Sequence, residues 1–178
     1  VWVPGMPRLP IRVCRLLIPA GTRARDVRVM AISQEEVPGE YVVYPAQTPR
    51  PVSAPGASVF EPGDRQVYES GQPWPSGVAE LQGTGEKCGF RIADVFVYPL
   101  RWTAAARRLE LCTEVAVRVD YEDDGTGQPS RSARQLAVAE GELRMLVDNP
   151  EDIPRFAPGK RATDPRDAEY VVVTSPAL

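Results

Sequence analysis

The sequence contains no histidine among its 178 residues. A serine or cysteine nucleophile is usually activated by a neighbouring imidazole, and histidine is also the commonest zinc ligand. Both kinds of site are therefore excluded within this chain. Carboxylates alone could carry acid–base chemistry, but no acidic pair stands in a recognisable context. We expect the segment itself to be no enzyme and to hold no metal or cofactor.

Cysteine is scarce, and long apolar runs are missing. Cys14, Cys88 and Cys112 are far apart and form no CxxC motif. At most one disulfide can form, and the sequence does not choose between one bridge and three reduced thiols. The stretch Ile11–Ala20 is too short to span a membrane and is interrupted by Arg15. Neither a membrane span nor a signal peptide is visible.

No charge of one sign dominates the chain, since 21 basic residues stand against 24 acidic ones and the net charge is −3. This balance supplies no basic field for nucleic acid, so we expect no nucleic-acid partner. Proline, by contrast, is abundant: its 19 residues are about twice the ordinary share. Turns and strand ends should therefore be frequent, and helices few.

Apolar and polar residues alternate through much of the chain, which is typical of half-buried strands. Asp26–Ser33 alternates most cleanly, with Val27, Val29 and Ala31 on one face. Only one helix is expected, over Arg134–Asn149. Shorter strands are predicted at Ile11–Pro19, Glu40–Tyr44, Gln66–Tyr68 and Gly77–Gln82.

The strongest local signal is a pair of long strand patterns, Phe90–Arg101 and Arg107–Tyr121. In the second, apolar residues recur at every other position, which excludes a helix. The connector Trp102–Ala106 has the length of a hairpin loop, so we expect the two arms to pair and their inner face to form the core. The predicted fold class is all-β, an antiparallel β-sandwich.

The end of the chain has a different character. Residues 155–168 are polar and basic and contain proline and glycine, the composition of an exposed linker that proteases cut. Tyr170–Val173 is apolar without alternation, as in a strand buried on both faces. We interpret it as the truncated first strand of an α/β domain. The alternative, that it is an edge strand of the same domain as the rest of the chain, stays open. The division is then a sandwich at 1–153, a linker at 154–168 and this strand at 169–178.

Two further features admit a binding role. The acidic run Glu122–Asp124 could bind calcium, but the spacing of an EF-hand loop is missing and a solvated turn is favoured. Trp74 lies between Pro73 and Pro75. An aromatic side chain in this setting can stack on a ligand or fill the domain's own core, and the core is the commoner outcome.

Three stretches, taken together, resemble the N-terminal propeptide region of gingipain-type cysteine peptidases, which are caspase-like enzymes. The stretches are Pro4–Pro10 with the strand stop Ile18–Gly21, the strands Asp94–Leu100 and Glu114–Val117, and Glu169–Pro176. The resemblance implies a secreted or cell-surface β-sandwich prodomain that assists folding of its own downstream peptidase domain and blocks the cleft until it is cleaved off. The catalytic histidine and cysteine would lie beyond Leu178.

The resemblance also assigns roles to basic residues. Cleavage after arginine or lysine in the linker would fall at Arg155, Lys160, Arg161 or Arg166. In the polar loop Asp123–Arg134, Arg131 or Arg134 would enter the main specificity pocket of the peptidase.

Two alternatives remain open at this point. Both loop arginines could simply balance the acidic residues Glu122–Asp124 on the surface. The whole chain could instead be a free-standing β-sandwich module that binds carbohydrate or protein, with Trp74 in its site.

Overall fold

The computed structural model of the chain describes residues 3–51, 53, 59–127 and 130–160. Strands dominate it, and the prediction of an all-β antiparallel sandwich is confirmed. In chain order the elements are β1 (Arg12–Ile18), β2 (Thr22–Val37), α1 (Arg65–Tyr68), β3 (Pro73–Trp74), β4 (Ala79–Lys87), β5 (Phe90–Val97), β6 (Leu100–Thr103), β7 (Arg108–Asp123), β8 (Ser130–Arg131), α2 (Ala133–Leu146), the 3-10 turn η1 (Pro150–Asp152), α3 (Ile153–Phe156) and β9 (Gly159–Lys160).

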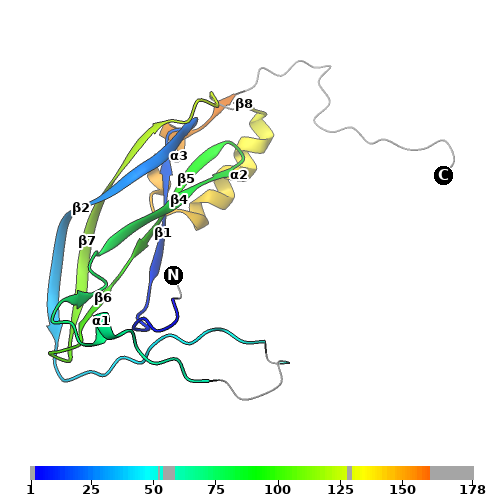
Figure 1. The fold of residues 1–178 in the computed structure, drawn as a ribbon. Coiled ribbons are helices and arrows are strands. Elements are labelled where there is room, and N and C mark those ends of the chain that lie inside the picture. The colour runs from blue at the N-terminus through cyan, green and yellow to red at the C-terminus, as the bar shows by residue number, and fades with distance from the viewer. Residues whose placement is uncertain (1–2, 52, 54–58, 128–129, 161–178) are drawn as a thin grey trace.

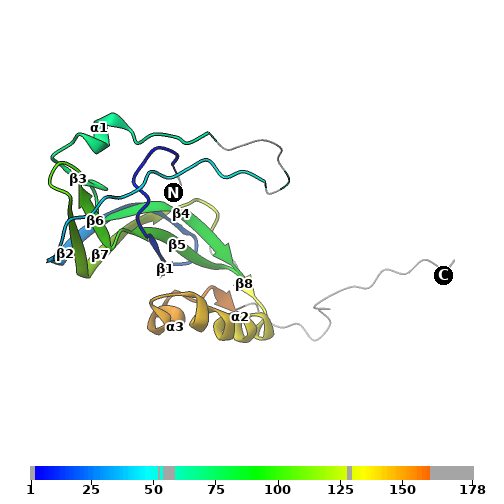
Figure 2. The same ribbon diagram turned by 90° about the horizontal axis from the view of Figure 1, so that it is seen from below.

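Two antiparallel sheets form the body of the molecule. One has the strand order β1-β5-β4 and the other β2-β7-β6-β3. The long strands β2 and β7 make a curved ribbon along one side (Figure 1). In the view turned by 90°, α2 and α3 cover one face of the β1-β5-β4 sheet (Figure 2). A third, two-residue pairing joins β8 to β9 and is parallel.

The main core lies between the β1-β5-β4 sheet and α2. Leu17, Phe90 and Ile92 face it from the sheet, and all are buried. The helical side is formed by Leu136, Ala139, Leu143, Val147 and Ile153. The first four of these recur at helical spacing, which makes α2 amphipathic. The expected helix over 134–149 is thus confirmed.

The start of α2 is fixed by a capping box. The Ser132 hydroxyl accepts a hydrogen bond from the Gln135 backbone N–H, and the Gln135 side chain accepts one from the Ser132 backbone N–H. The pair satisfies two donors that a helix start leaves unpaired. This cap lies directly after β8, so the helix start determines where the preceding loop ends.

The C-terminal end of α2 is tied to β1 by two side chains. Asn149 accepts from the Leu17 backbone N–H at 2.7 Å and donates to the Leu17 carbonyl at 3.1 Å. Asp148 accepts from the Arg15 backbone N–H at 2.9 Å and from the Arg12 guanidinium at 3.0 Å. The Asn149 amide therefore acts as a strand partner for the open edge of β1.

The predicted long hairpin is wrong in its first arm. Of the two strands in this arm, β6 pairs with β7, whereas β5 lies between β1 and β4 in the other sheet. The chain changes sheet at Tyr98-Pro99, where proline has no N–H to continue a ladder. The main partner of β7 is β2, which pairs with it along its whole length.

The expected facing of the β2–β7 ribbon is also wrong in part. Val29 is 39% exposed, although Val27, Val29 and Ala31 were expected to share one half-buried face. In the second arm Tyr121 is 47% exposed, whereas Cys112 is buried. Three register shifts interrupt the β2–β7 pairing, and each moves the following side chains to the other face. The core consequently lies against α2 rather than on the hairpin.

Three smaller predictions have different outcomes. The structure shows no strand over residues 40–44, and Gln66–Tyr68 belongs to α1, which Asp64 caps by accepting from the N–H groups of Gln66 and Val67. The strand predicted at 77–82 is present as β4 but continues to Lys87.

Cys14, Cys88 and Cys112 are all free thiols.

Candidate inhibitory loop and processing segment

The loop that follows β7 ends at β8, beside the segment that carries the processing candidates. In the parallel β8–β9 pairing Arg131 is the register partner of Lys160. Arg131 is a candidate for the inhibitory contact and Lys160 a candidate for processing, and the sequence placed them 29 positions apart. The fold brings these two together at one edge of the molecule (Figure 1).

The stem of the loop is anchored by its acidic residues. Asp124, whose side chain is only 8% exposed, pairs with the Arg91 guanidinium of β5. The Asp124 backbone N–H donates to the Gly21 carbonyl at 3.0 Å. Asp123 and Asp124 also accept from the backbone N–H groups of Gly125 and Thr126, at 2.7 and 2.9 Å. These carboxylates stabilise the turn, and the described residues contain no acidic cluster that could hold a metal.

Arg131 pairs with a residue of β4. Its Nη2 lies 3.3 Å from Glu86 Oε1, and its side chain is 33% exposed. The other Glu86 oxygen, Oε2, lies 3.5 Å from Arg91 Nη1. Glu122, by contrast, pairs with Arg23 at 2.7 Å. Arg131 therefore pairs with Glu86, whereas Glu122 and Asp124 of the acidic run pair with Arg23 and Arg91.

Arg134 lies in a different backbone setting from Arg131. It is exposed and stands in the first turn of α2, after the Ser132 cap. Arg131 has extended backbone in β8. Because a peptidase cleft binds extended chain, Arg131 is the better placed of the two for an inhibitory contact.

The described processing candidates lie in ordered elements. Arg155 stands in α3, 3.9 Å from Asp152 and over the ring of Phe156, and Lys160 stands in β9. Phe156 and Ala157 pack against the main core, and Pro158 is buried. Arg161, Arg166 and the strand expected at 169–178 lie outside the described residues. The three-part division of the chain stays a prediction, and the described part of its linker packs on the sandwich.

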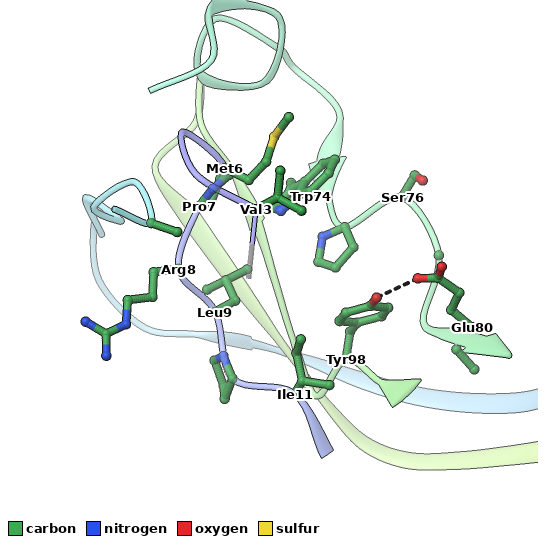
Figure 3. Close-up of a pocket in the computed structure, with 15 residues that line it drawn as sticks. Val3, Met6, Pro7, Arg8, Leu9, Ile11, Trp74, Ser76, Glu80 and Tyr98 are labelled. Atoms are coloured by element: carbon green, nitrogen blue, oxygen red, sulfur yellow. Dashed lines mark hydrogen bonds between the residues drawn. The ribbon is translucent and has the colours of Figure 1, made fainter. Parts of the chain in front are cut away.

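A pocket of about 820 Å³ lies on the side of the molecule that carries Trp74 (Figure 3). Its residues come from the N-terminal segment Val3–Ile11, from Trp74–Glu80 and from Tyr98. Tyr98 donates to Glu80 Oε2 at 2.7 Å, and burial together with this hydrogen bond raises the pKa of Tyr98 to about 12. The volume and the mainly apolar lining are those of a ligand site.

Comparison with known proteins identifies the fold. The chain is similar to a chain in the complex of the pro- and mature domains of RgpB from Porphyromonas gingivalis, with 23% sequence identity, 83% of this chain and 73% of that chain covered, and a TM-score of 0.59. The fold is that of gingipain prodomains. A structure bearing on the zymogenic latency of gingipain K from Porphyromonas gingivalis matches at 19% identity over 67% of this chain and 68% of that chain, with a TM-score of 0.53. No protein-family model and no curated protein sequence matches.

Within this gingipain-prodomain fold, sequence reasoning missed two residues of the candidate site, Glu86 and Arg91. Both lie at the β4–β5 turn, far in sequence from the loop that they contact. Neither belongs to a motif, so only the tertiary structure reveals them.

In the described part of the chain no helix has the length and apolar character that crossing a membrane requires.

Proposed function

We propose that this chain is the propeptide of a secreted or cell-surface gingipain-type cysteine peptidase. It would act as an intramolecular chaperone and as an inhibitor that keeps its own downstream catalytic domain latent. The observation that carries the proposal is the fold match, which extends over 83% of the chain to a structure of pro- and mature domains in complex. The absence of histidine from the chain agrees with a segment that is not itself catalytic.

The proposed inhibitory contact is Arg131. Its backbone is held on one side by the pairing with β9 and on the other by the Ser132 cap, while the Arg91–Asp124 ion pair anchors the stem of the loop. An inhibitor whose binding segment is already ordered loses less entropy on binding. The guanidinium would form a charge-assisted, bidentate pair with a carboxylate in the specificity pocket.

Processing is proposed at Arg161 or Arg166 rather than at the other two candidates. A protease binds extended backbone that is free of ladder hydrogen bonds. Arg155 stands in α3 and Lys160 in the β8–β9 pairing, so cleavage after either would require local unfolding. N-terminal sequencing of the mature enzyme tests this, and a mature start directly after Arg155 would contradict it.

The decisive experiment is co-expression of this chain with the coding sequence that follows Leu178. We expect several hundred further residues that include a histidine and a cysteine, and a mature peptidase that the prodomain inhibits when added back. Arg131→Ala should weaken that inhibition about tenfold or more, which corresponds to about 1.4 kcal/mol. Arg134→Ala, the matched control, should weaken it less. Full inhibition by Arg131→Ala would remove Arg131 from the contact.

The pocket at Trp74 supports a second candidate function, a binding module for carbohydrate or protein. Its volume of about 820 Å³ falls in the usual range for ligand sites, and the half-buried Trp74 indole in its wall could stack on a sugar ring. Titration of the protein with oligosaccharides or proline-rich peptides, followed by tryptophan fluorescence, tests it. A saturable change that Trp74→Ala abolishes would support the module, and an unchanged spectrum would reject these ligands.

A further inference from the structure

Four side chains near the candidate loop form a row of alternating charge: Asp124, Arg91, Glu86 and Arg131. Asp124 and Arg91 are the buried end, with side chains 8% and 17% exposed. Glu86 and Arg131 are the outer end, with side chains 39% and 33% exposed. Glu86 joins the two ends, since its oxygens lie 3.5 Å from Arg91 Nη1 and 3.3 Å from Arg131 Nη2.

The backbone on either side of Arg131 does not depend on Glu86. Arg91 keeps Asp124 as a partner, β8 keeps its pairing with β9, and Ser132 keeps its capping box. Loss of the Glu86 charge should therefore leave the loop in place and release only the Arg131 side chain. This separation makes the side chain testable apart from the fold.

We propose that the ion pair with Glu86 restrains the Arg131 side chain and so lowers its affinity for a specificity pocket that contains a carboxylate. That such a pocket belongs to a peptidase rests on the proposed inhibitory role of Arg131. To enter such a pocket the guanidinium exchanges Glu86 for the carboxylate of the partner. Only molecules with a released Arg131 bind, so the apparent dissociation constant rises as the released fraction falls. Glu86 is a positioning residue that acts through Arg131.

The expected size of the effect follows from exposure. Both partners are about one third exposed, and pairs of this kind contribute about 1 kcal/mol or less. Neutralising Glu86 should accordingly raise the affinity of Arg131 for a pocket about two- to fivefold. A larger gain would require a buried pair.

Trypsin provides a test that needs no cognate peptidase, because it takes an arginine side chain into a pocket containing an aspartate. The chain and its Glu86→Gln variant are digested briefly, and mass spectrometry gives the rate of cleavage after Arg131 relative to cleavage after Lys160, its neighbour in the β8–β9 ladder. We expect this ratio to rise about two- to fivefold in Glu86→Gln. The ratio corrects for any loss of stability and for opening of the ladder, since both expose Arg131 and Lys160 alike.

The matched control is Glu36→Gln. Glu36 pairs with Arg108 at 3.6 Å at the far end of the β2–β7 ribbon, so its loss should leave the ratio for Arg131 unchanged. An unchanged or lower ratio in Glu86→Gln overturns the inference, and so does cleavage after Lys160 without any cleavage after Arg131 in both proteins.

Inhibition of the mature peptidase then separates the inference from the proposed function. If both hold, Glu86→Gln inhibits about two- to fivefold more tightly than the unchanged chain. A raised trypsin ratio, together with full inhibition by Arg131→Ala, would support the holding role of Glu86 and reject Arg131 as the inhibitory contact.

Discussion

At the scale of single residues, stability depends on a few side chains between the sheet and α2. Phe90, Leu143 and Ile153 have no exposed surface. They come from three elements of the chain and meet in one cluster. Truncation of any of them removes apolar contacts and leaves a cavity that the rest of the core fills only partly.

Leu143→Ala should lower the free energy of unfolding by about 2–5 kcal/mol, the usual range for a buried leucine. Val138→Ala, on the same helix but 58% exposed, is the matched control and should stay within about 0.5 kcal/mol. Urea denaturation of both variants measures the difference. Similar losses for the two would contradict the facing of α2.

The Tyr98–Glu80 pair predicts a pH dependence at the alkaline end. The pKa of Tyr98 is raised from 10.0 to about 12, so the folded state favours the protonated phenol. Its contribution to stability should be complete below about pH 10 and be lost as the pH rises towards 12. Ultraviolet titration of the phenolate, with Tyr98→Phe as the reference, measures the shift. A midpoint near the ordinary value would contradict both the burial of Tyr98 and its hydrogen bond to Glu80.

At the scale of elements, Asn149 is one of the two side chains that dock α2 on β1. It satisfies both the N–H and the carbonyl of Leu17, a residue that is 2% exposed. A backbone group left without a partner in such a place costs about 1–3 kcal/mol. The connection between helix and sheet is therefore specified by a polar group as well as by the apolar face of α2.

Asn149→Ala should lower the free energy of unfolding by about 1–3 kcal/mol. Gln72→Ala, at an exposed position outside the named elements, is the control and should have almost no effect. Thermal unfolding followed by circular dichroism compares the two. A loss no larger than that of the control would show that water replaces the Asn149 amide.

The elements differ in how well the sequence predicts them, and the reason is whether their signals are local. β1 was predicted because Pro19 and Gly21 end its apolar pattern, and α2 because Asn149-Pro150 ends a stretch whose apolar residues fit the helical period in part. The partner of β5 could not be predicted, since it depends on the change of sheet at Pro99. β8 and β9 contain two residues each, which is too short for any pattern. Arg131 could be proposed from the composition of its own loop. Its partner Glu86 could not, because the contact between them depends on the tertiary structure.

At the scale of the whole molecule, the structure has a packed core under α2 and an open stretch in the middle of β2. The main cluster lies where α2 covers the β1-β5-β4 sheet (Figure 2). Further buried residues, Trp102, Leu109 and Cys112, lie in β6 and near the start of β7. Between these two regions Met30 is 62% exposed and Ile32 is 39% exposed. Local stability should follow this difference in burial.

Hydrogen exchange should reveal this difference directly. We expect the slowest amides in β5 and in the buried turns of α2, and faster exchange in β2 from Arg28 to Ser33, where the side chains are exposed. Equal protection of the two regions would contradict the expectation and would indicate that the sandwich opens only as one unit.

The parallel pairing of β8 with β9 has a mechanical consequence. The chain leaves the described fold through Lys160, whose neighbour across the ladder is Arg131. A pull on the residues beyond Lys160 therefore loads this two-residue ladder before it reaches the closely packed core under α2. The ladder would act as a weak link in series with the core, so that tension applied beyond Lys160 would disturb the loop at Arg131 while the rest of the molecule stayed folded.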